Sequence, residues 1–181
     1  MIIKNNISLK DLNTFGMSVV AREFIKIESK KDLIAALNTN PSNMLILGGG
    51  SNMLLTKDVD ALVLHINIKG IKVVSGSENN VRVEVAAGEN WHEFVSWCID
   101  KNYGGVENLS LIPGNVGTAP IQNIGAYGVE LKDSFVSCKA INIDTKKLRT
   151  FTKKDCNFGY RNSIFKEELK GQYIITSVTF E

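Results

Sequence analysis

The stretch Leu109–Glu130, LSLIPGNVGTAPIQNIGAYGVE, is uncharged until its last residue, Glu130. It contains four glycines and two prolines, and it shows neither the period of a helix nor that of a strand. Because glycine lets another group approach the backbone closely, such a loop is suited to hold a flat or phosphorylated ligand with its backbone amides. A buried structural loop is the alternative, and composition alone does not separate the two.

A second glycine-rich segment, Gly48–Asn52 (GGGSN), directly follows the apolar run Met44–Leu47, which is typical of a buried strand. Three glycines and a serine after a strand predict a nest of backbone amides for a diphosphate. A dinucleotide-binding fingerprint is excluded, because Met53 stands where its third glycine belongs and no helical pattern follows. No Gly-Lys-Ser/Thr ends the segment, so it is not a P-loop. A tight structural turn remains the alternative.

Short alternating runs predict most of the regular structure as strands. Two helices are also expected, one capped by Ser29 and ended by Pro41, and one over Trp91–Lys101 that is ended by Gly104 and Gly105. His92 lies off the apolar stripe of the second helix and is expected at the surface. The predicted strands are Phe24–Glu28, Met44–Leu47, Ala61–Ile66, Ile71–Ser75, Val81–Ala86, Val136–Ile143, Leu148–Phe151 and Ile174–Phe180.

The strands outnumber the helices and do not alternate with them regularly, which predicts an α+β fold and not a doubly wound sheet. A soft boundary near Lys69–Gly70 divides the chain into a first lobe, residues 1–69, and a second lobe, residues 70–181. The chain of 181 residues is long enough for two small lobes or for one domain of ordinary size.

Composition excludes several classes of function. The formal net charge of +2 implies no strong attraction to nucleic acid or to an acidic membrane. Cys98, Cys138 and Cys156 lie far apart in the sequence, which argues against a disulfide framework and against a metal site. The amino terminus has too short an apolar run for a signal peptide, and no stretch approaches the ~18 apolar residues of a membrane span. We expect a soluble, cytoplasmic monomer.

Five segments taken together resemble one family. They are Asn13–Gly16 (NTFG), Leu47–Asn52 (LGGGSN), Gly88–Trp91 (GENW), Ile112–Glu130 (IPGNVGTAPIQNIGAYGVE) and Phe158–Lys166 (FGYRNSIFK). Their ordered set resembles the UDP-N-acetylenolpyruvoylglucosamine reductases, also called UDP-N-acetylmuramate dehydrogenases, which are flavoenzymes of bacterial peptidoglycan biosynthesis. The resemblance covers nearly the whole chain and implies the two-lobed FAD-binding fold of the vanillyl-alcohol oxidase type, with FAD between the lobes.

The resemblance also implies which residues hold the cofactor. Backbone amides of the first glycine-rich segment and the Ser51 hydroxyl would hold the diphosphate, and the later stretch would wrap the diphosphate and the isoalloxazine ring. The implied FAD contacts are Gly48, Gly49, Gly50, Ser51, Asn52, Pro113, Gly114, Thr118, Ala119, Asn123 and Gly125.

The reaction implied by the resemblance has two halves. NADPH reduces the flavin, and the reduced flavin reduces the enolpyruvyl double bond of a UDP-sugar, giving UDP-N-acetylmuramate. A fixed guanidinium is suited to stabilise the negative charge that develops on the substrate, and Arg161 matches the family's catalytic arginine. Tyr160 and Arg161 are the candidate substrate contacts, whereas Gln122 and Tyr127 fit a structural role equally well.

The sequence departs from the family in what it lacks. The family's proton-donating serine, in a Gly-Ser-Phe-Phe-like motif, has no counterpart here, and neither do its carboxyl-terminal glutamate and its third, substrate-closing domain. We therefore expect a fragment, the FAD-binding portion of the reductase, that binds FAD and turns over poorly or not at all. A non-catalytic flavin- or nucleotide-binding module is one alternative, and a structural α+β domain without a ligand is the other.

Overall fold

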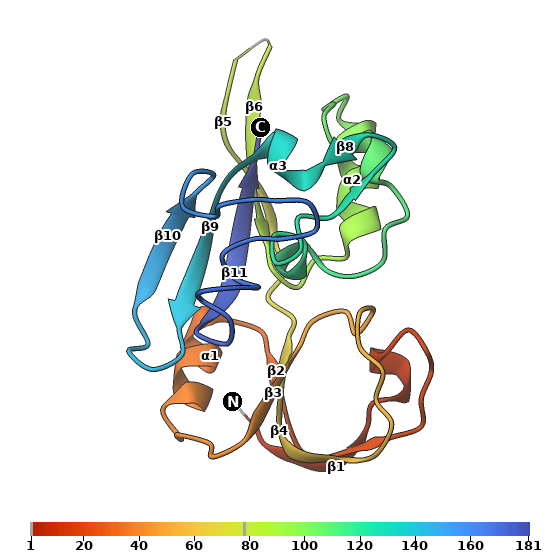
Figure 1. Cartoon of the computed structure of the whole chain (residues 1–181), viewed down its shortest axis with the longest axis vertical. Helices are drawn as coiled ribbons and strands as arrows, with labels where there is room; N and C mark the ends of the chain where they lie inside the picture. The colour runs from red at the N-terminus through yellow and green to blue at the C-terminus, as the bar shows by residue number, and fades with distance from the viewer. Residues whose placement is uncertain (1, 78) are drawn as a thin grey trace. The chain divides into compact units, whose positions relative to one another are not determined.

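The structure is a computed structural model that describes residues 2–77 and 79–181. It divides into two compact units, Met1–Ile68 and Lys69–Glu181 (Figure 1). Each unit has its own β-sheet, and each sheet buries its own group of apolar side chains. Helices lie outside the sheets and do not alternate regularly with the strands, so the predicted α+β class is confirmed.

The first unit is built on a four-stranded sheet with the order β1-β2-β4-β3. Its first two strands run antiparallel, whereas β2 and β3 both run parallel to β4. The helix α1 (Lys30–Leu37) connects β2 to β3, as a parallel crossover requires. The four strands are β1 (Lys4–Ser8), β2 (Val20–Ile27), β3 (Met44–Leu47) and β4 (Val59–Ile66).

Four details of the first unit differ from the sequence-based expectation or refine it. β1 was not predicted, because its sequence KNNIS buries little apolar surface and the strand forms through backbone pairing with β2. β3 is an edge strand, so only Leu47 of its four residues is fully buried. The expected cap of α1 is confirmed, since the Ser29 side chain accepts a hydrogen bond from the Asp32 amide at 3.1 Å. The helix nevertheless ends at Leu37, before Pro41.

The second unit is built on a five-stranded antiparallel sheet with the order β10-β9-β11-β6-β5. The predicted strands of this region are all present, with ends that differ by a residue or two. They are β5 (Ile71–Gly76), β6 (Val81–Ala86), β9 (Phe135–Asn142), β10 (Leu148–Thr152) and β11 (Tyr173–Phe180). The predicted turn between β5 and β6 includes Glu78, which lies outside the described residues.

The helix α2 (Trp91–Asp100) packs on this sheet through the predicted apolar stripe. The Asn90 side chain caps it by accepting a hydrogen bond from the Glu93 amide at 3.1 Å. The two glycines at 104 and 105 do not end the helix. Asn102 does so, because it takes a left-handed conformation with φ of 56° and turns the chain so that the Tyr103 amide donates to the Cys98 carbonyl.

The loop over residues 109–130, called the cradle loop below, contains short elements that its sequence did not predict. One is a 3-10 turn, Val116–Thr118, and another is a two-residue hairpin of β7 (Gly125–Ala126) and β8 (Val129–Glu130). Tyr127 and Gly128 join its strands with φ of 52° and 80°, the pattern of a tight hairpin turn that matches sheet twist. The helix α3 (Leu131–Ser134) follows directly.

Candidate functional site

The segment Ala87–Trp91, between β6 and α2, fixes one side of the cradle loop by backbone hydrogen bonds. The Trp91 amide donates to the Gly114 carbonyl at 2.9 Å. The Val116 and Gly117 amides donate to the carbonyls of Glu89 and Ala87, each at 2.9 Å. Asn90 and Asn115 face each other across this short antiparallel ladder. The first half of the cradle loop is therefore held by the backbone of residues 87–91.

Gly117 is required by this ladder. A Cβ at Gly117 would overlap both the side chain and the backbone of Ala87, which is fixed between β6 and the ladder. The close approach of the two backbones explains why a glycine stands there.

The two aromatic rings at the start of α2 also bind the cradle loop. The buried Trp91 donates its indole N–H to the Leu109 carbonyl at 2.7 Å. His92 was expected at the surface, but it is half-buried, and its Nδ1 lies 3.1 Å from the Ser110 hydroxyl and 3.4 Å from the Leu111 amide. The expectation failed because the apolar stripe of a helix does not show which loop folds over its polar side.

Asn123 lies at the centre of the second half of the cradle loop. Its side chain has no exposed surface. Its amide donates to the Gly159 carbonyl at 2.9 Å, and its Oδ1 accepts from the Lys132 amide at 3.0 Å. Asn123 therefore joins the loop to the FGYRNS turn and to the start of α3. These contacts give its side chain a structural role, and contact between Asn123 and a cofactor stays a prediction.

Arg161 reaches the cradle loop from the FGYRNS turn. Its guanidinium donates to the Asn123 carbonyl at 3.4 Å and to the Gly125 carbonyl, and it lies 5.6 Å from the Tyr160 ring centre. The φ of Arg161 is 51°, a left-handed conformation that is uncommon for a residue other than glycine and is often found at functional sites. The structure thus holds a guanidinium in place from both ends, by its backbone and by two carbonyls.

Gly125 leaves room for this guanidinium. A Cβ at Gly125 would lie 2.6 Å from Arg161 Nη1 and 2.8 Å from the Val129 carbonyl oxygen. Arg161 can therefore keep its position only if residue 125 has no side chain.

An open pocket of about 390 Å³ lies beside Arg161. Residues of the β7–β8 hairpin line it, and so do two tyrosines, Tyr127 and Tyr160, with 89% and 85% of their surface exposed. The charged residues that line it are Glu130, Lys132 and Arg161. A pocket of this size, lined by two glycines and two cationic side chains, is suited to an anionic or flat ligand.

Glu130 and Lys132 form an ion pair at the edge of this pocket. The hydrogen bond from Lys132 to Glu130 raises the pKa of Lys132. Among the described residues, Glu130 Oε1 has no hydrogen-bond partner although it is buried. A buried carboxylate oxygen without a partner is costly, so this side of the pocket is polar and incompletely satisfied.

The other glycine-rich segment, Gly48–Asn52, belongs to the first unit and packs against the NTFG turn. Gly50 has φ of 63°, and a Cβ there would overlap the backbone of Leu12 and Asn13. The Thr14 amide donates to the Gly50 carbonyl at 3.1 Å. Two of the five family-like segments are thus joined at Gly50, which explains this glycine by packing, whereas Ser51 and Asn52 retain exposed surface.

The structure distributes the predicted site residues over three places. The first place is the open pocket and its surroundings, which bring together Asn123, Gly125, Tyr160 and Arg161. For every predicted residue, contact with FAD or substrate stays a prediction. The second place is the backbone ladder and the residues next to it in the chain, which include Pro113, Gly114, Thr118 and Ala119. Ala119 is buried, and the Thr118 hydroxyl donates to the Asn115 carbonyl at 2.8 Å. Gly48, Gly49, Gly50, Ser51 and Asn52 form the turn of the first unit.

Sequence reasoning missed residues that hold the site by their side chains. The buried Ser163 donates to the Ile121 carbonyl at 2.7 Å, which joins the FGYRNS turn to the cradle loop. Glu89 binds the backbone of Gly70 at 2.5 Å. The signal was available, because both residues stand inside segments quoted for the resemblance, but spacing alone does not tell which side chain turns inward.

Two features are absent from the part of the chain that the structure describes. Across residues 2–77 and 79–181, no three His, Cys, Asp or Glu side chains gather as metal ligands would. No helix in the same ranges is both long and apolar enough to cross a membrane.

Comparison with known proteins agrees with the resemblance. A family model described as FAD binding domain matches residues 22–150. The UDP-N-acetylenolpyruvoylglucosamine reductase of Flavobacterium johnsoniae is 58% identical over 182 residues, covering 100% of this chain and 54% of that protein. The reductase of the same name from Pseudomonas putida is 47% identical over 180 residues, covering 98% of this chain and 53% of that protein.

A solved structure agrees as well. The crystal structure of UDP-N-acetylenolpyruvylglucosamine reductase from Thermus caldophilus matches with a TM-score of 0.77 and 25% sequence identity, over 100% of this chain and 62% of that one. The chain spans about half the length of the curated relatives it matches, 54% in the first case above. The predicted α+β FAD-binding fold is confirmed by the family match and by this structural likeness.

Proposed function

Because the chain belongs to the FAD binding domain family, we propose that it is the FAD-binding part of a UDP-N-acetylenolpyruvoylglucosamine reductase. The whole protein would reduce the enolpyruvyl group of UDP-N-acetylglucosamine enolpyruvate with electrons from NADPH, a step of peptidoglycan biosynthesis. The relatives that match over nearly the whole chain carry this name, and they support the proposal.

The observation that carries the proposal is the fixed guanidinium of Arg161 at the open pocket. Its donation to the Asn123 and Gly125 carbonyls keeps the side chain extended toward the hairpin. A positive charge that is already in place stabilises negative charge developing on a substrate without reorganisation. Arg161 would hold the substrate's carboxylate side, and Tyr160 would pack beside it.

The residues present fit an anionic, flat cofactor. Both loops are rich in glycine and neither contains a lysine, so the proposed phosphate contacts are backbone amides. Gly48, Gly49, Gly50, Ser51 and Asn52 in the first unit, and Pro113, Gly114, Thr118, Ala119, Asn123 and Gly125 in the second, are the proposed FAD contacts. When bound, FAD would supply the hydride-transfer chemistry between NADPH and the substrate. The chain's own residues orient the reactants and stabilise charge.

The visible absorption spectrum tests cofactor binding. The purified chain is mixed with FAD and desalted, and we expect flavin bands to remain with the protein. The absence of retained flavin, both here and in the longer protein that contains this sequence, would contradict the proposal.

Catalysis is tested separately in that longer protein. We expect substrate to reoxidise the reduced flavin, and Arg161→Lys to slow this step because one ammonium does not replace the planar fork of donors. Retained flavin without any substrate-dependent reoxidation would favour a non-catalytic flavin-binding module instead.

A further inference from the structure

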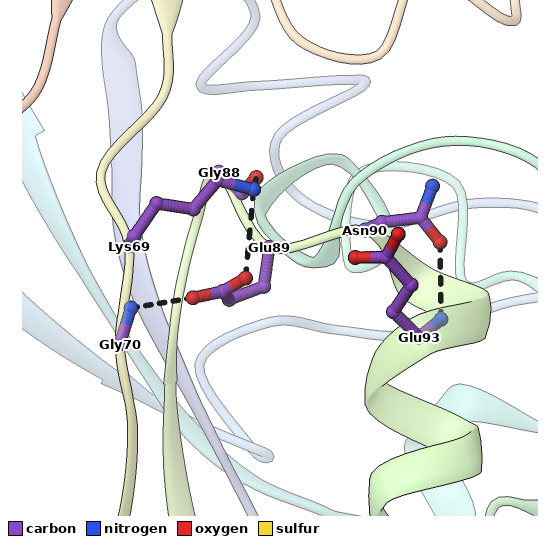
Figure 2. Close-up of polar contacts among 6 residues, drawn as sticks. All are labelled: Lys69, Gly70, Gly88, Glu89, Asn90 and Glu93. Carbon is purple, nitrogen blue, oxygen red and sulfur yellow. Dashed lines mark hydrogen bonds and ion pairs between the residues drawn. The ribbon is translucent and has the colours of Figure 1, made fainter.

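The Glu89 side chain holds the first residues of the second unit. Its Oε1 accepts a hydrogen bond from the Gly70 amide at 2.5 Å, and its Oε2 lies 3.5 Å from Lys69 Nζ. Lys69 Nζ also donates to the Gly88 carbonyl at 2.5 Å. Figure 2 shows the Lys69 and Glu89 side chains directed toward each other, with Gly70 on the other side of the carboxylate.

Lys69 and Gly70 stand where the chain leaves the first unit, since that unit ends at Ile68. Gly70 has φ of 133°, which disfavours any residue with a side chain, and its carbonyl accepts from the Ala86 amide at 2.8 Å. Lys69 and Gly70, called the crossing below, are therefore held by the positive φ of Gly70, by a backbone hydrogen bond and by the Glu89 carboxylate.

The backbone of Glu89 binds the cradle loop at the same time. Its carbonyl accepts from the Val116 amide at 2.9 Å, in the ladder that holds Gly114–Gly117. The Glu89 side chain is only 18% exposed, so its charge-assisted bond to Gly70 is partly shielded from water. One residue thus connects the crossing from the first unit to the loop proposed to hold FAD.

We propose that Glu89 is a positioning residue for the cofactor, one that fixes the Lys69–Gly70 crossing to the cradle loop and so sets the affinity for FAD. The inference rests on the proposed function, because it assigns a role toward the same cofactor. A loop that is held in its binding conformation loses less entropy when its ligand binds. Removing the Glu89 carboxylate therefore loosens both the Lys69–Gly70 crossing and the ladder to the cradle loop, and it weakens the binding of FAD.

The chain offers a matched control four residues away. Glu93 stands in the first turn of α2, is exposed, and contributes its backbone amide to the Asn90 cap (Figure 2). Glu93→Ala removes the same charge from the same segment and leaves both the crossing and the ladder intact.

The experiment measures the FAD dissociation constant by titration and the hydrogen exchange of the Gly70 and Val116 amides. We expect Glu89→Ala to raise the dissociation constant about tenfold, in line with the loss of a hydrogen bond to a charged group. Glu89→Gln keeps an acceptor for Gly70 but not the charge for Lys69, so about a threefold rise is expected. Glu93→Ala should stay within about twofold of the wild type.

Each outcome decides the inference. An FAD affinity of Glu89→Ala equal to that of Glu93→Ala overturns it. If Glu89→Ala does not fold, Glu89→Gln and Lys69→Met are compared with Glu93→Ala in the same way. If the wild-type chain takes up no FAD, the same titrations are made in the longer protein that contains this sequence, and the absence of FAD binding there too would contradict the proposed function, whereas hydrogen exchange still tests the link between Gly70 and Val116. Faster exchange at both amides in Glu89→Ala alone supports the coupling, and unchanged exchange at Val116 overturns it.

Discussion

The absence of a side chain at Gly125 leaves room for the Arg161 guanidinium in the candidate site. A Cβ at this position would meet Arg161 Nη1 at 2.6 Å, the Val129 carbonyl oxygen at 2.8 Å and Glu130 Cγ at 3.1 Å. Gly125→Ala should displace the guanidinium and cost about 1–3 kcal/mol of stability, because overpacking forces neighbours to shift. We expect retained flavin to fall, measured by absorbance after desalting, together with a lower thermal midpoint.

Gly159→Ala is the control for this change. A Cβ at Gly159 would lie 3.6 Å from the Asn162 Cβ, an ordinary contact. Equal flavin retention in the two variants would show that Gly125 is not needed for the site.

Asn123 offers a second test at the residue scale, this time of stability. Asn123→Ala removes a fully buried side chain and leaves the Gly159 carbonyl and the Lys132 amide, both of half-buried residues, without their partner. We expect a loss of about 2–4 kcal/mol in the free energy of unfolding, because buried polar groups without partners are costly. Urea unfolding followed by tryptophan fluorescence measures it, since Trp91 and Trp97 belong to the same unit.

The matched control is Asn157→Ala. Asn157 is exposed and has φ of 45°, close to the 43° of Asn123, so both variants impose the same backbone strain on alanine. That strain costs about 1–2 kcal/mol. A loss at Asn123 no larger than at Asn157 would mean that the side-chain hydrogen bonds contribute nothing.

At the scale of elements, the turn after β10 provides a test by pH. The Asp155 carboxylate accepts from the Thr152 hydroxyl at 2.6 Å and from its amide at 2.8 Å, and these hydrogen bonds lower the pKa of Asp155. A lowered pKa in the folded state contributes stability above the ordinary carboxyl pKa of 3.8, and this stability is lost as the pH falls through the folded value.

Thr152→Val removes the hydroxyl donor but keeps the amide. We expect the pKa of Asp155 to move back toward its ordinary value, as followed by a carbon-detected NMR titration. Thr150→Val, at an exposed position of the same strand, should leave it unchanged. An unchanged titration of Asp155 in Thr152→Val would exclude the Thr152 hydroxyl as the cause of the lowered pKa.

Elements with a periodic sequence were predictable, and elements made by long-range pairing were not. The stripe Trp91, Phe94, Val95 and Cys98 predicted α2, because a helical period is local information. β1 was not predicted, because KNNIS becomes a strand only when β2 lies beside it. The same holds within the site. The glycines of the cradle loop were visible in the sequence, whereas the links of Glu89 to Gly70 and of Asn123 to Gly159 depend on how distant segments meet.

At the scale of the whole molecule, the chemical probes are distributed unevenly between the two units. Cys98, Cys138 and Cys156 all belong to the second unit, and so do both tryptophans. All three thiols are buried and free. Cys138 and Cys156, far apart in the sequence, are neighbours in the fold, since a hydrogen bond between them, with burial, raises the pKa of Cys138. Burial raises the pKa of Cys98 to about 12.

These thiols should therefore report the unfolding of the second unit. The thiolate is the reactive form, and a raised pKa and burial both suppress it near neutral pH. We expect Ellman's reagent to label none of the three cysteines rapidly in the native protein and all of them in denaturant.

Across a urea series, the labelled fraction should follow the loss of tryptophan fluorescence, because both probes lie in one cooperative unit. A thiol that reacts while the fluorescence is still native would reveal local opening, and its identity would show which part opens: Cys98 the α2 side of the sheet, or Cys138 and Cys156 the β9–β10 side.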